Sequence, residues 1–486
     1  MVSGGLEDLL EGRRSRRLRW LVLAVALGVI LGVAVVAVVR AYPPQAGGLA
    51  GDFRVFYAAG GVIARGQSPY GLSLLAAAEH AALAYPGPNR APAYFAYPPP
   101  TAWLMALLAK LPFWVAFGVF TAVGAGTAAL TLNLLGRDLG WRHTTVLVVG
   151  AGAAWVGLSG LIYGQFDALL FAALAGSMLL AWHDRPLGAG LVMGVTLLKP
   201  DLLWPAPIFM FLAIWPHRDQ AARFAIGFLA VCLAWLALSW SQLGNWLQAL
   251  SRFGHMVSST PSRGPAGLPG LVAAAPSPWA WRSGLTQPPS LALMAAALLG
   301  MAVLGLWMAR SPDWRGLSQV GRITWAVGLA MALWLVATPY NHANDDLLLL
   351  PLFMLTVGRD ARRLHGLGLG PALALAALLL LVWPGGVVPW QLGLAIFALA
   401  AGAAWWWRTD ARLTGLGAGL CLLGLALLPP VWSLHVLRAS LTPVAVLLLV
   451  VEGARTCWME VGGAGTGPVY FAEPALPGVA GPASRA

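Results

Sequence analysis

The sequence predicts an all-α protein that crosses a membrane many times, and three observations support this prediction. Hydrophobic residues make up 59% of the 486 residues, and charged residues only 10%. Soluble proteins carry about 25% charged residues, so this chain lacks the charge to cover a soluble surface. Apolar runs of membrane-spanning length also recur along it. A soluble enzyme, a disordered chain and a nucleic-acid-binding protein are therefore poor fits.

The first element we expect is a transmembrane helix at residues 20–39. This segment has no polar side chain apart from the indole of Trp20, and it is long enough to cross about 30 Å of hydrocarbon. The basic segment 13–19 before it predicts a cytoplasmic amino terminus at 1–19. A cleaved signal peptide is the alternative, but its apolar core has only about 7–15 residues. Residues 40–96 then form the first extracytoplasmic loop.

The chain continues with a series of apolar runs, which predict about twelve to fourteen transmembrane or re-entrant helices in one domain at 20–458. Several runs are shorter than a full span. The Gly-, Ala- and Pro-rich tail at 459–486 is expected to be disordered. The runs are 97–111, 113–135, 144–160, 166–182, 187–198, 202–215, 223–240, 289–309, 322–337, 345–357, 371–383, 390–406, 413–430 and 441–451.

The net charge of +12 is explained by an excess of basic residues in cytoplasmic loops, without a nucleic-acid partner. That rule favours a topology in which 97–111 dips into the membrane from outside, because most arginine-bearing loops then face the cytoplasm. If 97–111 crosses instead, 187–215 must be one long helix broken at Pro200. Both topologies place 241–288, the second large extracytoplasmic loop, and 338–344 outside.

Two polar candidates lie in and just after the first loop. Asp52 precedes a predicted helix at 53–65 that ends at Gly66, and its carboxylate is either a helix cap or a general base above the membrane surface. Tyr97 comes directly before three prolines that lead into an apolar helix. It either marks the membrane interface or contacts a ligand.

Polar residues at the ends of later runs are further candidates. Gln165 and Asp167 lie in a Gly-Gln-Phe-Asp segment, which is either a turn with a capping aspartate or a functional pair. Lys199 lies between two apolar runs. It either pairs locally with Asp201, extends to the membrane interface, or binds a phosphate as a point charge.

The segment 337–351 is short and dense in polar groups. Helix capping by Asn344 or Asp345 explains part of it. His342 is either an ordinary loop histidine or a hydrogen-bond donor to an anion or hydroxyl. The adjacent carboxylates of Asp345 and Asp346 are a weak signal for a metal, so we predict neither a metal nor another cofactor.

Under the favoured topology these candidates share one side of the membrane. Capping residues that act independently would be found on both sides, so the shared outer side predicts a single site. The residues that end on this side are Asp52, Gln165, Asp167, Lys199 and His342.

At these motifs the chain resembles glycosyltransferase family 87, the bacterial membrane mannosyltransferase-like proteins of the C-type glycosyltransferase superfamily. His342 after Thr338-Pro339 resembles the late histidine-bearing outer loop of that family. Asp167 is a departure, because the family often has Asn there. The matching motifs are Asp-Phe-x-x-Phe-Tyr-Ala-Ala at 52–59, Gly-x-x-Pro-Tyr at 66–70, Tyr-Pro-Pro at 97–99, Gly-Gln at 164–165 and Lys-Pro at 199–200.

The resemblance implies a C-type glycosyltransferase fold in the bacterial inner membrane. It also implies an inverting, metal-independent transfer of a sugar, usually mannose, from a polyprenyl-phosphate donor to a glycolipid or glycan acceptor on the extracytoplasmic face. Asp52 matches the catalytic base. We expect Lys199, His342 and Arg54 to bind the donor phosphate. The expected substrate contacts are Gln165, Asp167, Tyr97 and Asn344.

Other functions remain open. A lipid-linked glycan ligase or polymerase would use basic residues of the second large loop, here Arg252, His255 and Arg263. A transporter or flippase would also keep Lys199 and Asp167 near the membrane, but it should show paired half-helices or repeats, and no repeat of fixed period is visible. A non-catalytic assembly subunit with lipid contacts is a further alternative.

Overall fold

The structure is a computed structural model that describes residues 50–83, 95–141, 160–259, 288–338 and 343–363, together with isolated residues at 146, 157 and between 446 and 461. The described residues belong to two compact units, which are treated separately below. The first unit comprises the described residues within Met1–Phe95, Trp103–Thr121 and Gly160–Gln165. The second comprises those within Ala96–Ala102, Ala122–Ser159 and Phe166–Ala486.

The first unit is built on helix α2 (Phe53–Ala64), which packs against α3 (Leu72–Leu83). Gly66 follows α2 with φ +74°, a left-handed conformation that glycine adopts without steric cost and that commonly ends helices. The predicted helix at 53–65 and its stop are therefore confirmed.

Aromatic packing fixes the start of α2 within this unit. The fully buried ring of Phe53 contacts three phenylalanine rings from the first half of α5 (Phe113–Asp138), with ring centroids 5.3–5.5 Å apart. The Tyr57 hydroxyl donates a hydrogen bond to the Leu111 carbonyl at 2.7 Å. These contacts hold the beginning of α2 in a fixed position, which matters because Asp52 directly precedes it.

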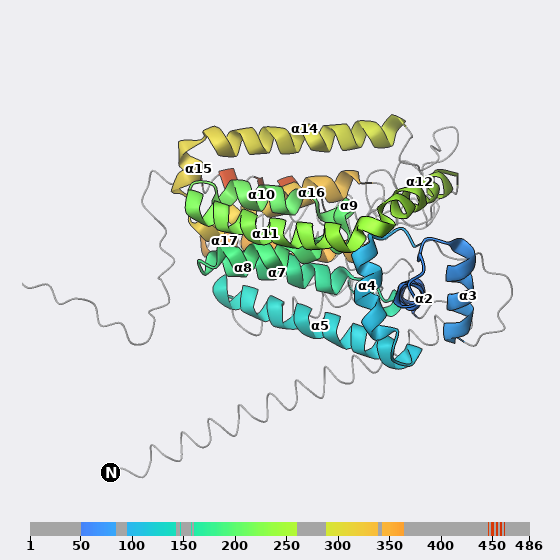
Figure 1. Ribbon diagram of the computed structural model, residues 1–486. Helices are drawn as coiled ribbons and strands as arrows, with labels where there is room; N and C mark the ends of the chain where they lie inside the picture. The colour runs from blue at the N-terminus through green and yellow to red at the C-terminus, as the bar shows by residue number, and fades with distance from the viewer. Residues whose placement is uncertain are drawn as a thin grey trace, which may run out of the picture. The chain divides into compact units, whose positions relative to one another are not determined.

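The second unit is a bundle of helices, most of which run roughly along one direction (Figure 1). Helix α16 (Gln319–Ala337) is at its centre, because nearly all of its residues are buried. It packs on α10 (Pro205–Ile214), α14 (Pro288–Arg310) and α17 (Leu350–Arg363). Helices α4 (Pro99–Leu108) and α5 belong partly to each unit. The other helices of the bundle are α7 (Asp167–Trp182), α8 (Pro186–Met193), η2 (Gly194–Leu198), α9 (Pro200–Leu203), α11 (Arg218–Ser239), η3 (Trp240–Gln242), α12 (Leu243–Ser259), α15 (Pro312–Gly316) and η4 (Ala343–Leu349).

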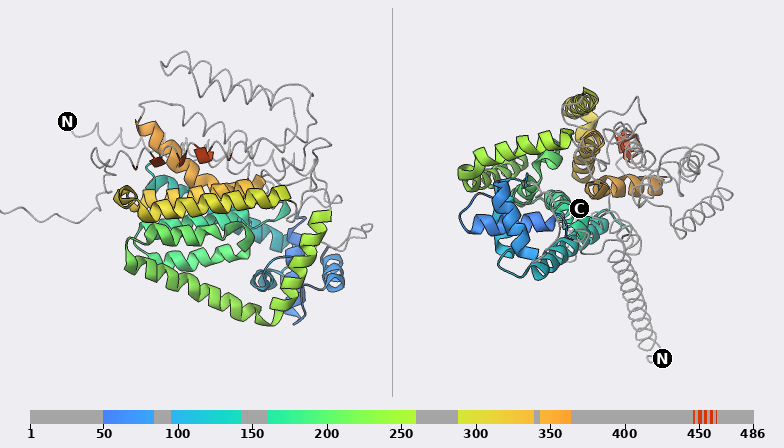
Figure 2. Two further views of the ribbon diagram at one scale, coloured as in Figure 1. Left: turned by 90° about the horizontal axis from the view of Figure 1, so that it is seen from above. Right: turned by 90° about the vertical axis from the view of Figure 1, so that its right-hand side faces the viewer.

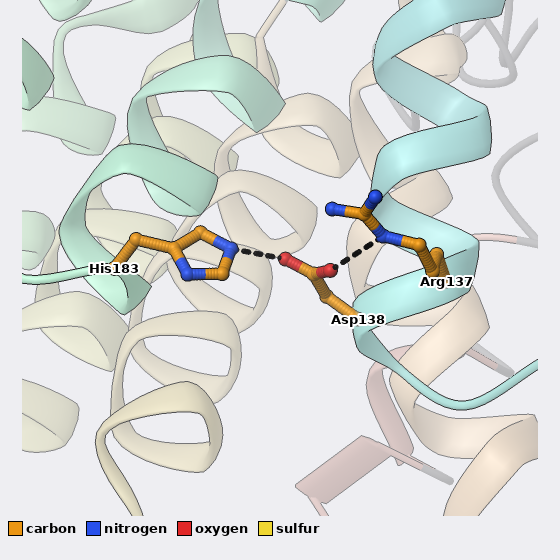
Figure 3. Close-up of polar contacts among 3 residues, drawn as sticks. All are labelled: Arg137, Asp138 and His183. Carbon is orange, nitrogen blue, oxygen red and sulfur yellow. Dashed lines mark hydrogen bonds and ion pairs between the residues drawn. The ribbon is translucent and has the colours of Figure 1, made fainter. Parts of the chain in front are cut away.

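Polar contacts define one end of this bundle, which we call the His183 end. The His183 Nε2 atom lies 2.6 Å from Asp138 Oδ2, and Arg137 Nε donates to Oδ1 of the same carboxylate at 3.3 Å (Figure 3). At the same end Gln319 donates to the Ala181 carbonyl at 2.7 Å. Helix α7 has 16 residues and is therefore about 24 Å long, so Asp167 lies at the opposite end, which we call the Lys199 end.

The chain between α7 and α11 turns back on itself at Lys199. From the His183 end the chain runs as α8 and η2 to Lys199. The Lys199 side chain lies 3.6 Å from that of Asp167, at the opposite end of the bundle. The chain then returns as α9 and α10 to His217, whose ring nitrogen lies 3.0 Å from Arg322 at the His183 end. The predicted break at Pro200 is present, but the chain reverses there, so 187–215 does not continue in one direction as the alternative topology requires.

The described helices confirm an all-α polytopic membrane protein. Four of them are long and apolar enough to cross a membrane, by length and composition, and the described residues contain no strand. The ten-residue helix α4 rises only about 15 Å, so it cannot cross alone. The four long helices are Phe113–Asp138, Arg218–Phe253, Leu291–Arg310 and Gln319–Ala337.

Several predictions concern residues outside the described part of the chain. These are the basic segment and helix before residue 40, most of the runs at 144–160 and 441–451, the three runs between 371 and 430, and the tail at 459–486 apart from Val461. The sequence analysis did not identify a helix in the second large loop. Residues 243–259 of that loop form α12.

Two glycines allow α8 and α11 to pack with their backbones in contact. A Cβ atom on Gly190 would collide with the Phe224 carbonyl oxygen and lie 2.7 Å from the Phe228 nitrogen. A Cβ atom on Gly227 would collide with the Leu187 carbonyl oxygen in the reciprocal position. Small residues have the same effect at other helix interfaces in membranes.

We expect Gly190→Ala to lower the thermal unfolding temperature of the detergent-purified protein, because the added methyl must push two backbones apart. Overpacking of this kind costs about 1–3 kcal/mol. Gly126→Ala is the matched control, since a Cβ atom there meets nothing within 4 Å. Equal unfolding temperatures for the two variants would contradict the close packing of α8 on α11.

Candidate functional site

In the first unit Asp52 is paired with Gln165. The Gln165 side-chain amide donates a hydrogen bond to Asp52 Oδ2 at 2.6 Å, across 113 residues of sequence. Asp52 is the N-cap residue of α2, but its side chain makes no capping hydrogen bond. Helix capping therefore does not explain the Asp52 carboxylate. Asp52 and Gln165, both predicted from the sequence as candidate site residues, are in direct contact.

The backbone around this pair is held from both sides. The amides of Ala50 and Asp52 donate to the carbonyls of Ile162 and Tyr163 at 2.7 and 3.0 Å. Gly164 has φ +75°, and a Cβ atom there would collide with Phe53. Only glycine tolerates both this positive φ and the lack of space for a Cβ atom without strain, which explains why glycine precedes Gln165.

Arg54 is engaged by Glu79 on α3. Its Nε atom lies 3.1 Å from Glu79 Oε2, and both side chains are largely buried. Among the described residues, Oε1 of Glu79 has no hydrogen-bond partner. Burial raises the pKa of the Glu79 carboxyl, whereas Arg54 and, to a smaller extent, His80 lower it. Sequence reasoning missed Glu79, because nothing in the α3 sequence links it to Arg54.

In the second unit Lys199 forms a buried ion cluster with two carboxylates, which we call the Lys199 cluster. Lys199 Nζ lies 2.6 Å from Asp345 Oδ1 and 3.6 Å from Asp167 Oδ1. All three side chains are almost completely buried. The ammonium is buried and does not extend to the interface, and its closest carboxylates are those of Asp345 and Asp167. The break between η2 and α9 places it here, because Pro200 cannot continue the preceding helix.

The Lys199 cluster joins three separate segments of the chain. Asp167 is in the first turn of α7, Lys199 lies between η2 and α9, and Asp345 belongs to η4. Its formal charge is −1, with one ammonium and two carboxylates. Asp345 is the residue that sequence reasoning considered only as a cap or metal ligand, although it is the closest partner of Lys199.

Tyr97 also belongs to the second unit and is half-buried at the start of α4. Its ring lies 6.2 Å from that of Phe166, between ring centroids. Phe166 is the residue directly before Asp167, so Tyr97 packs beside the segment that carries the cluster. Pro99 and Pro100 form the first turn of α4, as predicted.

The remaining predicted residues are only partly described. His342 lies outside the described residues, and so do the side chains of Asn344 and Asp346. No group of three or more His, Cys, Asp or Glu side chains among the described residues has a metal-binding arrangement. The Asp345 carboxylate is instead bound to Lys199.

We expect Asp345→Asn to destabilise the protein more than Asp167→Asn, because Asp345 is 1 Å closer to Nζ. Removing one partner of a buried ion pair costs about 3–5 kcal/mol. Thermal unfolding of the reconstituted protein measures both effects, with exposed Asp219→Asn as the control. The reverse order, or two variants as stable as the control, would contradict the cluster.

Glu79 predicts a pH dependence of stability. The pKa of Glu79 is raised in the folded state, so its neutral carboxyl stabilises the fold. This contribution is complete below the unfolded-state pKa of about 4.3. It is lost as the pH rises through the folded-state pKa. Glutamine stays neutral throughout. The unfolding temperature of Glu79→Gln should therefore rise relative to wild type as the pH is raised above about 4.

The control for this series is Asp313→Asn, which changes an exposed carboxylate at the start of α15. The unfolding temperatures of both variants and of the wild type are compared at each pH. A difference between Glu79→Gln and wild type that stays constant with pH, or shrinks as pH rises, would refute the assignment.

Comparison with known proteins gives one match. The sequence model of glycosyltransferase family 87 matches residues 95–339, just over half of the 486-residue chain. No curated protein and no solved structure matches. The matched range contains Tyr97, Gln165, Asp167 and Lys199, whereas Asp52 lies before it.

Proposed function

The chain belongs to glycosyltransferase family 87 and is a membrane glycosyltransferase, and on this premise we propose that it uses a polyprenyl-phosphate sugar, usually mannose in this family, as its donor. The acceptor is a glycolipid or glycan. The reaction takes place on the extracytoplasmic face of the bacterial inner membrane. It is an inverting displacement that needs no metal.

The observation that carries this proposal is the hydrogen bond between Gln165 and Asp52. A displacement at the anomeric carbon needs one base to take the proton of the acceptor hydroxyl. The acceptor oxygen then bonds to the anomeric carbon, and the bond from that carbon to the donor phosphate breaks. Asp52 is the proposed base, and Gln165 orients its carboxylate, which is not used as a helix cap.

Lys199 is the proposed ligand of the donor phosphate in the second unit. An ammonium has three N–H donors, and two carboxylates lie against it in the Lys199 cluster. Because that cluster has a formal charge of −1, phosphate binding requires further cationic donors. We propose His342 and Arg54 for this role, Arg54 after exchange from Glu79. Tyr97, Asp167 and Asn344 are the proposed substrate contacts.

A transporter is the second candidate function, and the chain reversal at Lys199 favours it. Helices α8 with η2 and α9 with α10 form two short, apolar, broken segments that meet at a buried ion cluster. Transporters build binding sites from such half-helices. For the ligase or polymerase alternative, Arg252 is an exposed residue of α12 and Arg263 lies outside the described residues, so no observation favours it.

The test is sugar transfer by the purified protein in liposomes, with polyprenyl-phosphate mannose and a membrane glycolipid extract. Asp52→Asn should lower the turnover by a factor of about 10²–10⁴, the usual contribution of a general base. Gln165→Ala should give a smaller loss, because the carboxylate remains. Asp313→Asn serves as the control and should transfer at the wild-type rate.

The outcomes separate the candidate functions. Full turnover by a folded Asp52→Asn protein would refute the base assignment. If the wild type transfers no sugar from any polyprenyl-phosphate donor but moves a lipid-linked sugar across the bilayer, the transporter is the correct function. Unchanged unfolding temperatures ensure that a loss of turnover reflects chemistry and not misfolding.

A further inference from the structure

Helix α12 has the pattern of an amphipathic helix. One face carries apolar residues that are related by spacings of three and four positions, namely Leu243, Trp246, Leu247, Leu250 and Phe253. The opposite face carries polar residues. These polar residues are Asn245, Gln248, Ser251 and Arg252.

The burial of these side chains divides the helix into three sectors. Ala249 is buried, and Trp246 donates from its indole Nε1 to the Ala96 carbonyl at 3.0 Å, so this sector faces the protein. Leu247 and Leu250 are apolar yet 54% and 43% exposed. Gln248 and Arg252 are exposed on the polar side. A helix with separate protein, apolar and polar sectors fits the boundary between lipid and water.

The exposed apolar sector continues an apolar surface on the preceding helix. Leu229, Leu233 and Leu236 on α11 are 44–66% exposed, and α11 is part of a segment long and apolar enough to cross a membrane. Trp240, in the turn between the two helices, is 71% exposed. Tryptophan is enriched at the membrane interface. The apolar surface therefore extends from a spanning helix, past an interfacial residue, onto α12.

The direction of α12 differs from that of the bundle. The chain bends at η3, and α12 runs across the direction of α11 and α14 (Figures 1 and 2). Helix α11 has 22 residues, about 33 Å, and it starts at the His183 end. Helix α12 therefore lies at the Lys199 end, next to the Ala96–Tyr97 segment.

We propose that α12 lies flat in the membrane interface at the Lys199 end, with Leu247 and Leu250 in the acyl chains and Gln248 and Arg252 in the aqueous headgroup region. The partner is the lipid bilayer itself. The apolar sector of α12 continues the exposed apolar face of α11, which indicates that lipid covers both. The inference is independent of sugar transfer, since it rests only on the packing and direction of α12.

The test uses nitroxide labels on single cysteines at residues 247, 248, 250 and 252 of the full chain in liposomes. The three native cysteines are first replaced by alanine, and the unfolding temperature of that background is checked. All four sites are exposed, so labelling should preserve the fold. Each label is then tested for accessibility to oxygen, which partitions into lipid, and to a water-soluble nickel chelate.

The labels at 247 and 250 should favour oxygen, and those at 248 and 252 should favour the nickel chelate. A preference for nickel at all four positions would refute the proposal, because α12 would then lie in water. Shielding of 247 and 250 from both reagents would also refute it, because protein, either another part of this chain or a second copy, would then cover the apolar sector.

Discussion

The buried ion cluster of Lys199 with Asp345 and Asp167 is the interaction on which the second unit depends. An isolated ammonium or carboxylate in an apolar interior is strongly disfavoured, so each member requires the others. The cluster therefore ties the start of α7, the break before α9 and the start of η4 to one point. Because its members come from three separate segments, it fixes the end of the bundle that carries the candidate residues.

The segment Gly-Gln-Phe-Asp at 164–167 links this cluster to the other candidate pair through the chain itself. Gln165 bonds to Asp52 in the first unit, and Asp167 contacts Lys199 in the second. The turn at Gly164, before Gln165, is held within the first unit, where the amides of Ala50 and Asp52 donate to the carbonyls of Ile162 and Tyr163. The collision that any Cβ would make with Phe53 explains why glycine occupies that position.

The sequence predicted the helices well because a membrane-spanning helix leaves a long apolar run, and it predicted the end of α2 because Gly66 is a strong local signal. It also identified Asp52, Gln165, Asp167 and Lys199 as candidates, since polar residues are conspicuous in apolar surroundings. It did not predict that Asp345 pairs with Lys199, 146 residues away. Long-range partners leave no local pattern, and for the same reason the Arg54–Glu79 pair was missed.

The two ends of the second unit differ in charge, and this difference has consequences for orientation. Basic residues gather at the His183 end, where Arg137, Arg218 and Arg322 lie, whereas the Lys199 cluster is formally negative. Basic loops are retained in the cytoplasm during membrane insertion, which favours an outward-facing Lys199 end. A negative cluster at that end cannot attract a phosphate by net charge alone. If the donor carries a phosphate, as proposed, that phosphate therefore has to be held by more cations than Lys199.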